Sequence, residues 1–398
     1  MVLTTPRQSM GRTASGLQCG FSLIELMVSL VIGLVILGAL VGMFVNSSGG
    51  NREMARANTL IENGRLSLEV LESDVVHAGY WGGHVPEFDD QTLEAENPPT
   101  VPTDVPTAIP DPCQDYQTDP WSALDRGNLV HIPLQVYDET PTVCGGVILD
   151  QQADTDVLVV RHADLCVTGS GGNCEAEDPD ALYFQATRCF DEGPAAYVLD
   201  NVAANFTLTQ KDCVTAADKR KYVSHIYYVR DYAVTAGDGI PTLMRSEFGL
   251  DGGGDLGHLP AVAMVEGIEA FHVELGIDNR SEAYTGFANG SPVDYTAAVN
   301  WYDPTTRTTP TNRGDGSPDG AFVSCTTATP CTIAQLINVT AVKLYVLVRS
   351  REASPGYTDD KTYTLGGIVL GPFGDGFKRH VYVSTIRLPN VAGRRISP

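Results

Sequence analysis

The sequence is poor in basic residues: 26 Lys and Arg stand against 49 Asp and Glu, which gives a formal net charge of −23. Proteins that bind nucleic acids generally need cationic side chains to displace counterions from the phosphates. A chain this acidic is therefore not expected to bind nucleic acid. Hydrophobic residues make up 43% of the chain and aromatic residues 8%, which is ordinary for a protein with a packed core.

The sequence also lacks the common catalytic motifs. It has no G-x-S-x-G elbow, no H-E-x-x-H pair and no P-loop, and the glycine-rich stretch 169–172 has no lysine. Acidic stretches at 251–255 and 312–319 supply hard oxygens but do not have EF-hand spacing. His77 and His84 have no third ligand at zinc spacing. The sequence therefore predicts no enzyme, no cofactor and no metal site.

Cysteine is present, but no two cysteines form the C-x-x-C pair of zinc or redox sites. Cys19 lies early in the chain, and an even number of cysteines follows it, which favours disulfides in an oxidising compartment. Proximity favours Cys325–Cys331 first and Cys166–Cys174 second. The sequence leaves the pairing of the remaining four open: Cys113, Cys144, Cys189 and Cys213.

One long hydrophobic run extends from Phe21 to Val45, and its only ionisable side chain is Glu25. As a helix at ~1.5 Å per residue, this run reaches about 37 Å, enough to cross a bilayer. A carboxylate costs roughly 2.5–3.5 kcal/mol near a bilayer centre, so Glu25 is expected to have a partner. The preceding basic residues Arg7 and Arg12 orient the leader to the cytoplasm and the rest of the chain to the periplasm.

Residues 1–20 are polar and basic, with no apolar run of their own. A secretory signal peptide is cut after its apolar segment, whereas here the small residue Gly20 precedes that segment. Cleavage after Gly20 would leave the hydrophobic helix on the mature protein. We therefore interpret residues 1–20 as a leader.

The segment Gly20-Phe21-Ser22-Leu23-Ile24-Glu25 resembles the class III signal of type IV prepilins. The resemblance implies cleavage after Gly20 by the prepilin peptidase and N-methylation of Phe21. It also implies that the Glu25 carboxylate pairs with the charged N-terminal amine of a neighbouring subunit in a filament. Such a pair lets two costly charges compensate each other between apolar helices.

The helical pattern continues beyond the apolar run, with a weak point at 46–51. Apolar or small residues recur at helical spacing at Leu60, Gly64, Leu68, Leu71 and Val75. The pattern predicts one helix over 21–77, membrane-spanning over 21–45 and amphipathic after that. Small residues in its first half, which permit close helix approach, are Gly33, Gly38 and Gly42.

The remainder, 78–398, is expected to be a β-rich periplasmic body. It has two insertion loops, a proline-rich one at 86–120 and a Gly/Asn/Asp/Thr-rich one at 278–330. The predicted fold class is α+β: a long N-terminal helix packed on a mainly antiparallel sheet. The predicted strands are 128–137, 156–161, 224–232, 242–248, 271–277, 342–348, 363–370 and 380–388.

Several later segments are similar to PilW-type minor pilins of type IV pili. These are Asp74–Gly82, Val265–Glu269, Leu347–Ser350, Phe377–His380 and Ile386–Asn390. The resemblance implies a subunit that contacts other minor pilins and the major pilin through its N-terminal helix. It further implies an inner-membrane protein with its body in the periplasm, which then joins a tip complex at the cell surface. That complex primes pilus assembly and supports twitching motility and adhesion.

Two alternatives remain open at this point. The same N-terminal chemistry would serve a type II secretion minor pseudopilin of the J type. A membrane-tethered periplasmic enzyme or adhesin would also carry an anchor and an exported, disulfide-bonded body.

Overall fold

The computed structural model describes residues 20–91, 100–116, 121–193, 196–281 and 290–395. The chain divides into two compact units, one of residues 1–55 and one of residues 56–398. Helix α1 (Leu23–Val75) contributes to both. The expected helix over 21–77 therefore begins and ends two residues inside its predicted bounds, a difference that fraying of terminal turns readily produces.

In the first unit, the described residues belong mainly to α1, and the large apolar side chains from Phe21 to Val45 are exposed. Helix α1 is long and apolar enough to cross a membrane, with a mean hydropathy of 2.8 over its most apolar window, none of which is buried. The weak point expected at 46–51 is helical. Each glycine costs only about 1 kcal/mol in a helix interior, and the helical turns on both sides of this segment remove the need for a new nucleation step. The helix therefore continues through it.

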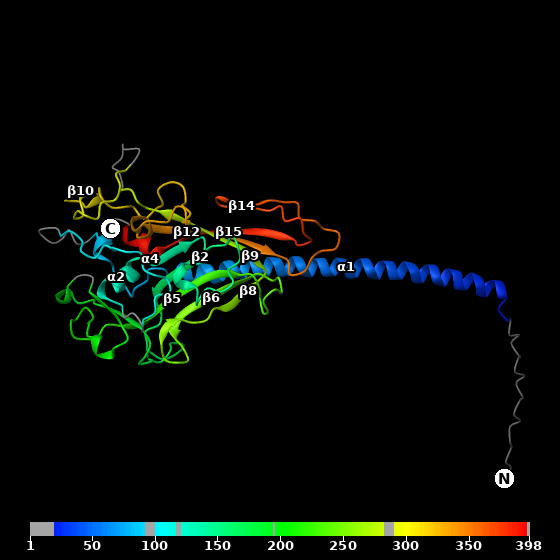
Figure 1. Cartoon of the computed structure of the whole chain (residues 1–398), viewed down its shortest axis with the longest axis horizontal. Helices are drawn as coiled ribbons and strands as arrows, with labels where there is room; N and C mark the ends of the chain where they lie inside the picture. The colour runs from blue at the N-terminus through cyan, green and yellow to red at the C-terminus, as the bar shows by residue number, and fades with distance from the viewer. Residues whose placement is uncertain (1–19, 92–99, 117–120, 194–195, 282–289, 396–398) are drawn as a thin grey trace, which may run out of the picture. The chain divides into compact units, whose positions relative to one another are not determined.

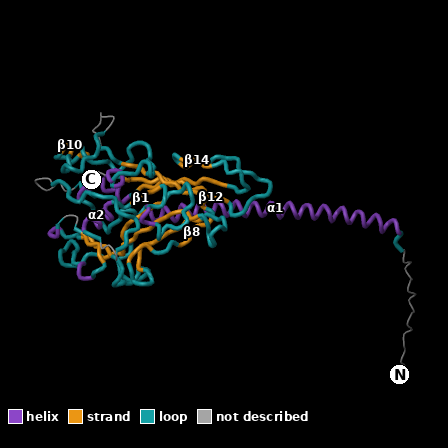
Figure 2. The backbone as a smooth tube through the Cα atoms, viewed as in Figure 1, coloured by secondary structure: helices purple, strands orange, loops and turns teal. Residues whose placement is uncertain are grey.

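The second unit consists mainly of strands and loops (Figure 2). Its short helices are α2 (Ala123–His131), α3 (Ile333–Leu336) and α4 (Pro389–Ala392). Its strands are β1 (Leu134–Tyr137), β2 (Val157–Ala163), β3 (Tyr183–Ala186), β4 (Tyr197–Asp200), β5 (Lys219–Arg230), β6 (Thr242–Leu250), β7 (Leu256–His258), β8 (Val262–Glu266), β9 (Ile268–Ile277), β10 (Trp301–Asp303), β11 (Thr308–Pro310), β12 (Val339–Arg349), β13 (Tyr363–Leu365), β14 (Ile368–Leu370) and β15 (Arg379–Arg387).

Two antiparallel sheets form most of the body. The larger has the order β1-β2-β5-β3-β4, and β6 adds to it by pairing with β5, β7 and β8. The smaller is β15-β12-β9, and β10-β11 and β13-β14 form separate hairpins. The predicted α+β class with a mainly antiparallel sheet is confirmed.

The second half of α1 contacts both sheets. Figure 1 shows β12 and β15 on one side of this part of α1 and β5, β6 and β8 on the other. Leu60, Leu71 and Val75 belong to one core cluster with apolar residues of both sheets. Gly64 faces the Tyr382 ring of β15 so closely that an added Cβ would lie 2.2 Å from a ring carbon. The amphipathic stripe is thus a core face, as its spacing predicts.

Residues 128–131 are helical, so the strand predicted over 128–137 begins only at Leu134. Ser122 and Asp125 form a capping box that starts α2, and this local signal outweighs the β-rich composition that follows. Residues 363–370 form two strands rather than one, because the backbone turns at Gly366, whose φ is +59°.

The proline-rich stretch 86–120 packs onto the body where it is described, and Pro102, Pro106, Pro110 and Pro112 are buried. The Gln135 side chain donates to the Pro110 carbonyl at 2.8 Å. Residues 92–99 and 117–120 of this loop, and 282–289 of the loop expected at 278–330, lie outside the described residues. The second loop also contains the hairpin β10-β11.

Candidate functional site

The N-terminal segment begins with a capping box. The Glu25 backbone N–H donates to Ser22 Oγ at 3.2 Å, and the Ser22 N–H donates to the Glu25 carboxylate at 3.2 Å. This reciprocal arrangement satisfies two of the unpaired donors at the helix start. Gly20 and Phe21 precede the helix and are exposed, with Phe21 86% accessible. In this unit the glutamate is therefore held in the first helical turn, next to the predicted cleavage point.

The three glycines expected to permit helix packing lie on α1 with open space around them. A Cβ added at Gly33, Gly38 or Gly42 would meet no described atom within 4 Å beyond the helix itself. The chain therefore leaves room at these positions for another helix. Their role in packing remains a prediction.

Four disulfides join the eight later cysteines in pairs. The structure contains Cys325–Cys331 and Cys166–Cys174, the two pairs that proximity favours. It also joins Cys113 to Cys144 and Cys189 to Cys213, across sequence separations of 31 and 24 residues. Sequence left these four open because their pairing depends on how distant segments come together. Cys19 lies outside the described residues.

The C-terminal end of α1 carries a buried carboxylate between two imidazoles. Asp74 Oδ1 lies 3.0 Å from His162 Nε2 on β2, and Asp74 Oδ2 lies 2.9 Å from His225 Nδ1 on β5. Burial of Asp74 by itself acts to raise its pKa. The hydrogen bonds and positive charge of the two histidines outweigh burial and hold the pKa well below its usual range.

The end of α1 is also held by the C-terminal segment. The Asn390 side chain donates to the Val76 carbonyl at 3.1 Å, and Arg394 Nη2 donates to the Gly79 carbonyl at 2.7 Å. Gly79 has a φ of +72°, the left-handed conformation common where helices end. Two segments distant in sequence, Asp74–Gly82 and Ile386–Asn390, therefore meet at the helix terminus.

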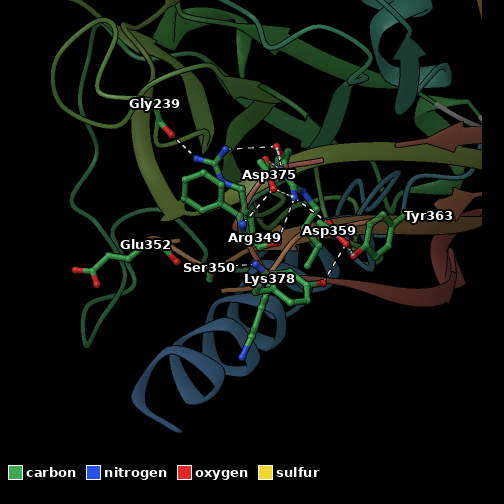
Figure 3. A network of polar contacts seen from close by, with 12 residues as sticks. Gly239, Arg349, Ser350, Glu352, Asp359, Tyr363, Asp375 and Lys378 are labelled. Carbon is green, nitrogen blue, oxygen red and sulfur yellow. Dashed lines mark hydrogen bonds and ion pairs between the residues drawn. The ribbon is translucent and has the colours of Figure 1, made fainter. Parts of the chain in front are cut away.

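A second polar network surrounds Arg379 at the start of β15. Its guanidinium contacts the Glu269 carboxylate of β9, Asp359 at 2.9 Å and Asp375 at 2.7 Å. Arg349 of β12 lies 3.4 Å from Glu269. Figure 3 shows Arg349, Asp359 and Asp375 gathered in this network, with dashed contacts joining them to the neighbouring residues.

Burial alone would lower the pKa of Arg379, but its hydrogen bonds to Asp375 and Glu269 raise it above its usual range. The ring of Phe373 also lies 3.8 Å from the guanidinium carbon. Glu269, Arg349 and Arg379 come from three of the five segments that resemble PilW-type pilins. In this structure, those segments converge on one ion-pair network.

Sequence reasoning missed the roles of Asp74, His162 and His225. A signal was present, because Asp74 falls within the apolar stripe, four residues after Val70 and next to Val75. A carboxylate there requires a partner. No sequence pattern identifies that partner, since His162 and His225 lie 88 and 151 residues away.

Two histidines considered from the sequence have other surroundings. His77 Nδ1 lies 2.6 Å from the Ser73 carbonyl, and His84 packs against His131 with ring centroids 5.9 Å apart. Among the described residues, neither belongs to a group of potential metal ligands. Arg313 of the stretch 312–319 is buried and donates to the Phe88 carbonyl at 3.1 Å.

Two comparisons with known families agree with these observations. Residues 16–41 match the model of the prokaryotic N-terminal methylation motif, and residues 226–390 match the model of type IV pilus-assembly protein W. The first match covers most of the apolar segment, including Glu25. The second covers the strands that carry Glu269, Arg349 and Arg379. No curated protein matched the sequence.

Among solved structures, the type IV-like pilin TTHA1219 from Thermus thermophilus matches at 14% identity, covering 65% of this chain and 84% of that one. Its TM-score of 0.24 is too low to carry a structural argument. The methylation motif and the exposed apolar helix define a prepilin-type, pilin-like protein with an α+β body. Residues 226–390 thus have the family pattern of type IV pilus-assembly protein W, and together with the methylation motif they support a PilW-type, prepilin-type minor pilin.

Proposed function

We propose that this minor pilin is cut after Gly20, N-methylated at Phe21 and held in the inner membrane with its body in the periplasm until it joins the pilus. There it enters a tip complex with other minor pilins that primes assembly. The observation that carries the proposal is the contrast within α1. Its first half exposes its apolar side chains, while its second half is built into the core of the body.

The apolar side chains of the exposed half of α1 allow it to move from one apolar environment to another. Lipid covers it before assembly, and the packed helices of a filament cover it afterwards. Because both environments are apolar, hydrophobic burial changes little when the helix moves from lipid to filament. Polar contacts therefore determine the position of the subunit in the filament. Glu25 supplies such a contact, since its carboxylate in the first turn can pair with the amine created by cleavage after Gly20.

The body supports a terminal position in the filament. The unit of residues 56–398 is much larger than the part of α1 that it buries. A body of this size suits a tip position better than a repeated position in the shaft. Twitching motility and adhesion would follow from the effect of this subunit on pilus number.

Mass spectrometry of the mature protein tests the processing step. We expect an N-terminal N-methylated Phe21 in a strain with active prepilin peptidase and the full leader in a peptidase mutant. An intact Met1 in the active strain would contradict the proposal.

A substitution of the glutamate tests assembly. We expect Glu25→Ala to be processed and to accumulate in the membrane, but to be at least tenfold depleted from sheared pili, because one costly charge then lacks its partner. Glu69→Ala, which changes an exposed glutamate in the same helix, is the matched control and should enter pili normally. Normal incorporation of Glu25→Ala would refute the pairing role.

Deletion of the gene separates the pilus role from that of a type II secretion pseudopilin. We expect loss of surface pili and twitching with protein secretion intact. Loss of secretion with normal twitching would favour the pseudopilin instead.

A further inference from the structure

We propose that Asp74, His162 and His225 form a binding site for one divalent transition-metal ion of the zinc type, which fastens the end of α1 to strands β2 and β5. The inference does not depend on the role of the protein in pili. It rests on the geometry of three side chains within the body unit.

The three residues come from three elements and converge. Their potential ligand atoms all lie within 4.8 Å of one another. In the β2-β5 ladder, His162 is opposite Val223 and Val160 is opposite His225, so the two histidines are diagonal neighbours on one face. Asp74 approaches that face from α1 and contacts both rings.

The contact made by Nδ1 of His162 determines whether the other ring nitrogen, Nε2, carries a proton or a lone pair toward Asp74. His162 Nδ1 lies 2.9 Å from the Ala163 carbonyl, which only accepts hydrogen bonds, so Nδ1 carries a proton. In the neutral ring, Nε2 then directs its lone pair at Asp74 Oδ1, 3.0 Å away. Two facing lone pairs at that distance require a positive species between them, either a second proton or a metal ion.

Three features favour the metal. A ring whose other nitrogen donates to a backbone carbonyl is the usual arrangement of a metal-ligating histidine. A second imidazole, His225, faces the same carboxylate, which a single added proton does not require. Two imidazoles and one carboxylate form a known zinc ligand set that leaves a fourth position for water.

The distances are compatible with a tetrahedral ion. At metal–ligand bonds of about 2.0–2.1 Å, neighbouring ligand atoms lie about 3.3 Å apart. The two contacts made by Asp74, through its two different oxygens at 3.0 and 2.9 Å, are near that value. The potential ligand atoms, which lie within 4.8 Å of one another, must draw closer together for one ion to bind all three residues. Asp74 and His162 are buried and His225 is partly accessible, so an ion would enter on the His225 side.

The test is zinc binding by the full chain in detergent micelles after metal removal with a chelator. Titration calorimetry with Zn²⁺ alone should show one ion per chain. Asp74→Asn, His162→Gln and His225→Gln should each weaken binding by at least about tenfold. His272→Gln is the matched control and should bind like wild type. His272 is a buried histidine 2.7 Å from the carboxylate of Asp156, and among the described residues this pair belongs to no group of three potential metal ligands.

A second measurement needs no variant and so stays decisive if the substitutions impair folding. X-ray absorption of the zinc-loaded wild-type chain should report two imidazole ligands and oxygen ligands for the remainder. Absence of zinc binding, a different imidazole count, or binding that none of the three substitutions weakens would overturn the proposal. A doubly protonated His162 in a chain that binds no zinc would identify the positive species as a proton.

Discussion

Glu25 and Asp74 are carboxylates of the same helix with opposite surroundings. Glu25 is exposed, and the hydrogen bonds that the structure describes for it go to Ser22 alone. Asp74 is buried and bonded to two imidazoles from the sheet. A buried carboxylate with its partners in the same chain stabilises the fold, whereas an exposed one in an apolar segment is available to another molecule. Under the proposed function, Asp74 thus serves folding and Glu25 serves assembly.

The glycines of the helix repeat this contrast. Gly33, Gly38 and Gly42 have open space where a side chain would be, while Gly64 touches the Tyr382 ring. A glycine against a ring allows close packing within the body. Glycines facing open space allow close packing with something outside the described part of this chain.

The largest expected effect on folding is that of Asp74→Ala. Its removal leaves one buried and one partly accessible imidazole without their anion, so we expect the free energy of unfolding to fall by about 3–5 kcal/mol. Urea unfolding of the full chain in detergent, with chelator present and followed by tryptophan fluorescence, measures it. The exposed Glu69→Ala should change stability by less than about 0.5 kcal/mol. A loss no larger for Asp74 than for Glu69 would remove the contrast.

The pH dependence of stability should be the next largest effect. Burial lowers the pKa of His131 to about 4 and the pKa of His84 well below its usual range, and the nearby charge of Arg394 acts in the same direction. The unfolded chain therefore binds more protons at these histidines, so the stability they contribute is lost as pH falls below about 6.5. Burial raises the pKa of Asp104 to about 6, which has the opposite effect between pH 6 and 4.

Between pH 6 and 4, the unfolded chain binds about two more protons than the folded protein at His84 and His131 and about one fewer at Asp104. The net difference is about one proton. We expect the free energy of unfolding to fall by about 1.4 kcal/mol per pH unit from pH 6 to 4 through these three groups. Urea titrations of wild type and His84→Gln across this range measure the slope. The variant should be flatter by about 1.4 kcal/mol per pH unit. Parallel curves would show that His84 is protonated in the folded state.

A smaller effect is expected for Gly64→Ala. The added methyl group would lie 2.2 Å from a Tyr382 ring carbon, so the ring must move. Overpacking costs about 1–3 kcal/mol, and the gain in helix propensity offsets about 1 kcal/mol of it. We expect a net loss of about 1 kcal/mol in urea unfolding. Gly42→Ala, with open space around it, should leave body stability unchanged, and equal losses for both variants would contradict the packing difference.

The smallest expected effect is that of Glu25→Ala on body stability. Because the described contacts of Glu25 are confined to the first helical turn, we expect a change below about 0.5 kcal/mol. The same variant is expected to be depleted from pili, so the result would separate the two roles of α1. A large loss of body stability would show that the carboxylate also serves folding.

Local chemistry made much of this molecule predictable. The apolar run, the helix over most of 21–77, and the alternating strands such as 271–277 and 342–348 follow from side-chain periodicity. Where prediction went wrong, at 128–131, a capping box of four residues, Ser122 to Asp125, outweighed strand composition. The partners of Asp74 and the pairing of Cys113 and Cys189 were not predictable, because each depends on contacts between distant segments.

The sequence by itself determined that the chain has a long apolar helix with one acid and a β-rich body with an even number of cysteines, and it predicts an export-type leader. Each of these follows from residue type and spacing over a few turns or strands. Only the tertiary structure decided that Asp74 lies between His162 and His225, and that Glu269, Arg349 and Arg379 form one network. These contacts join residues 80 or more positions apart, and chain folding alone brings them within bonding distance.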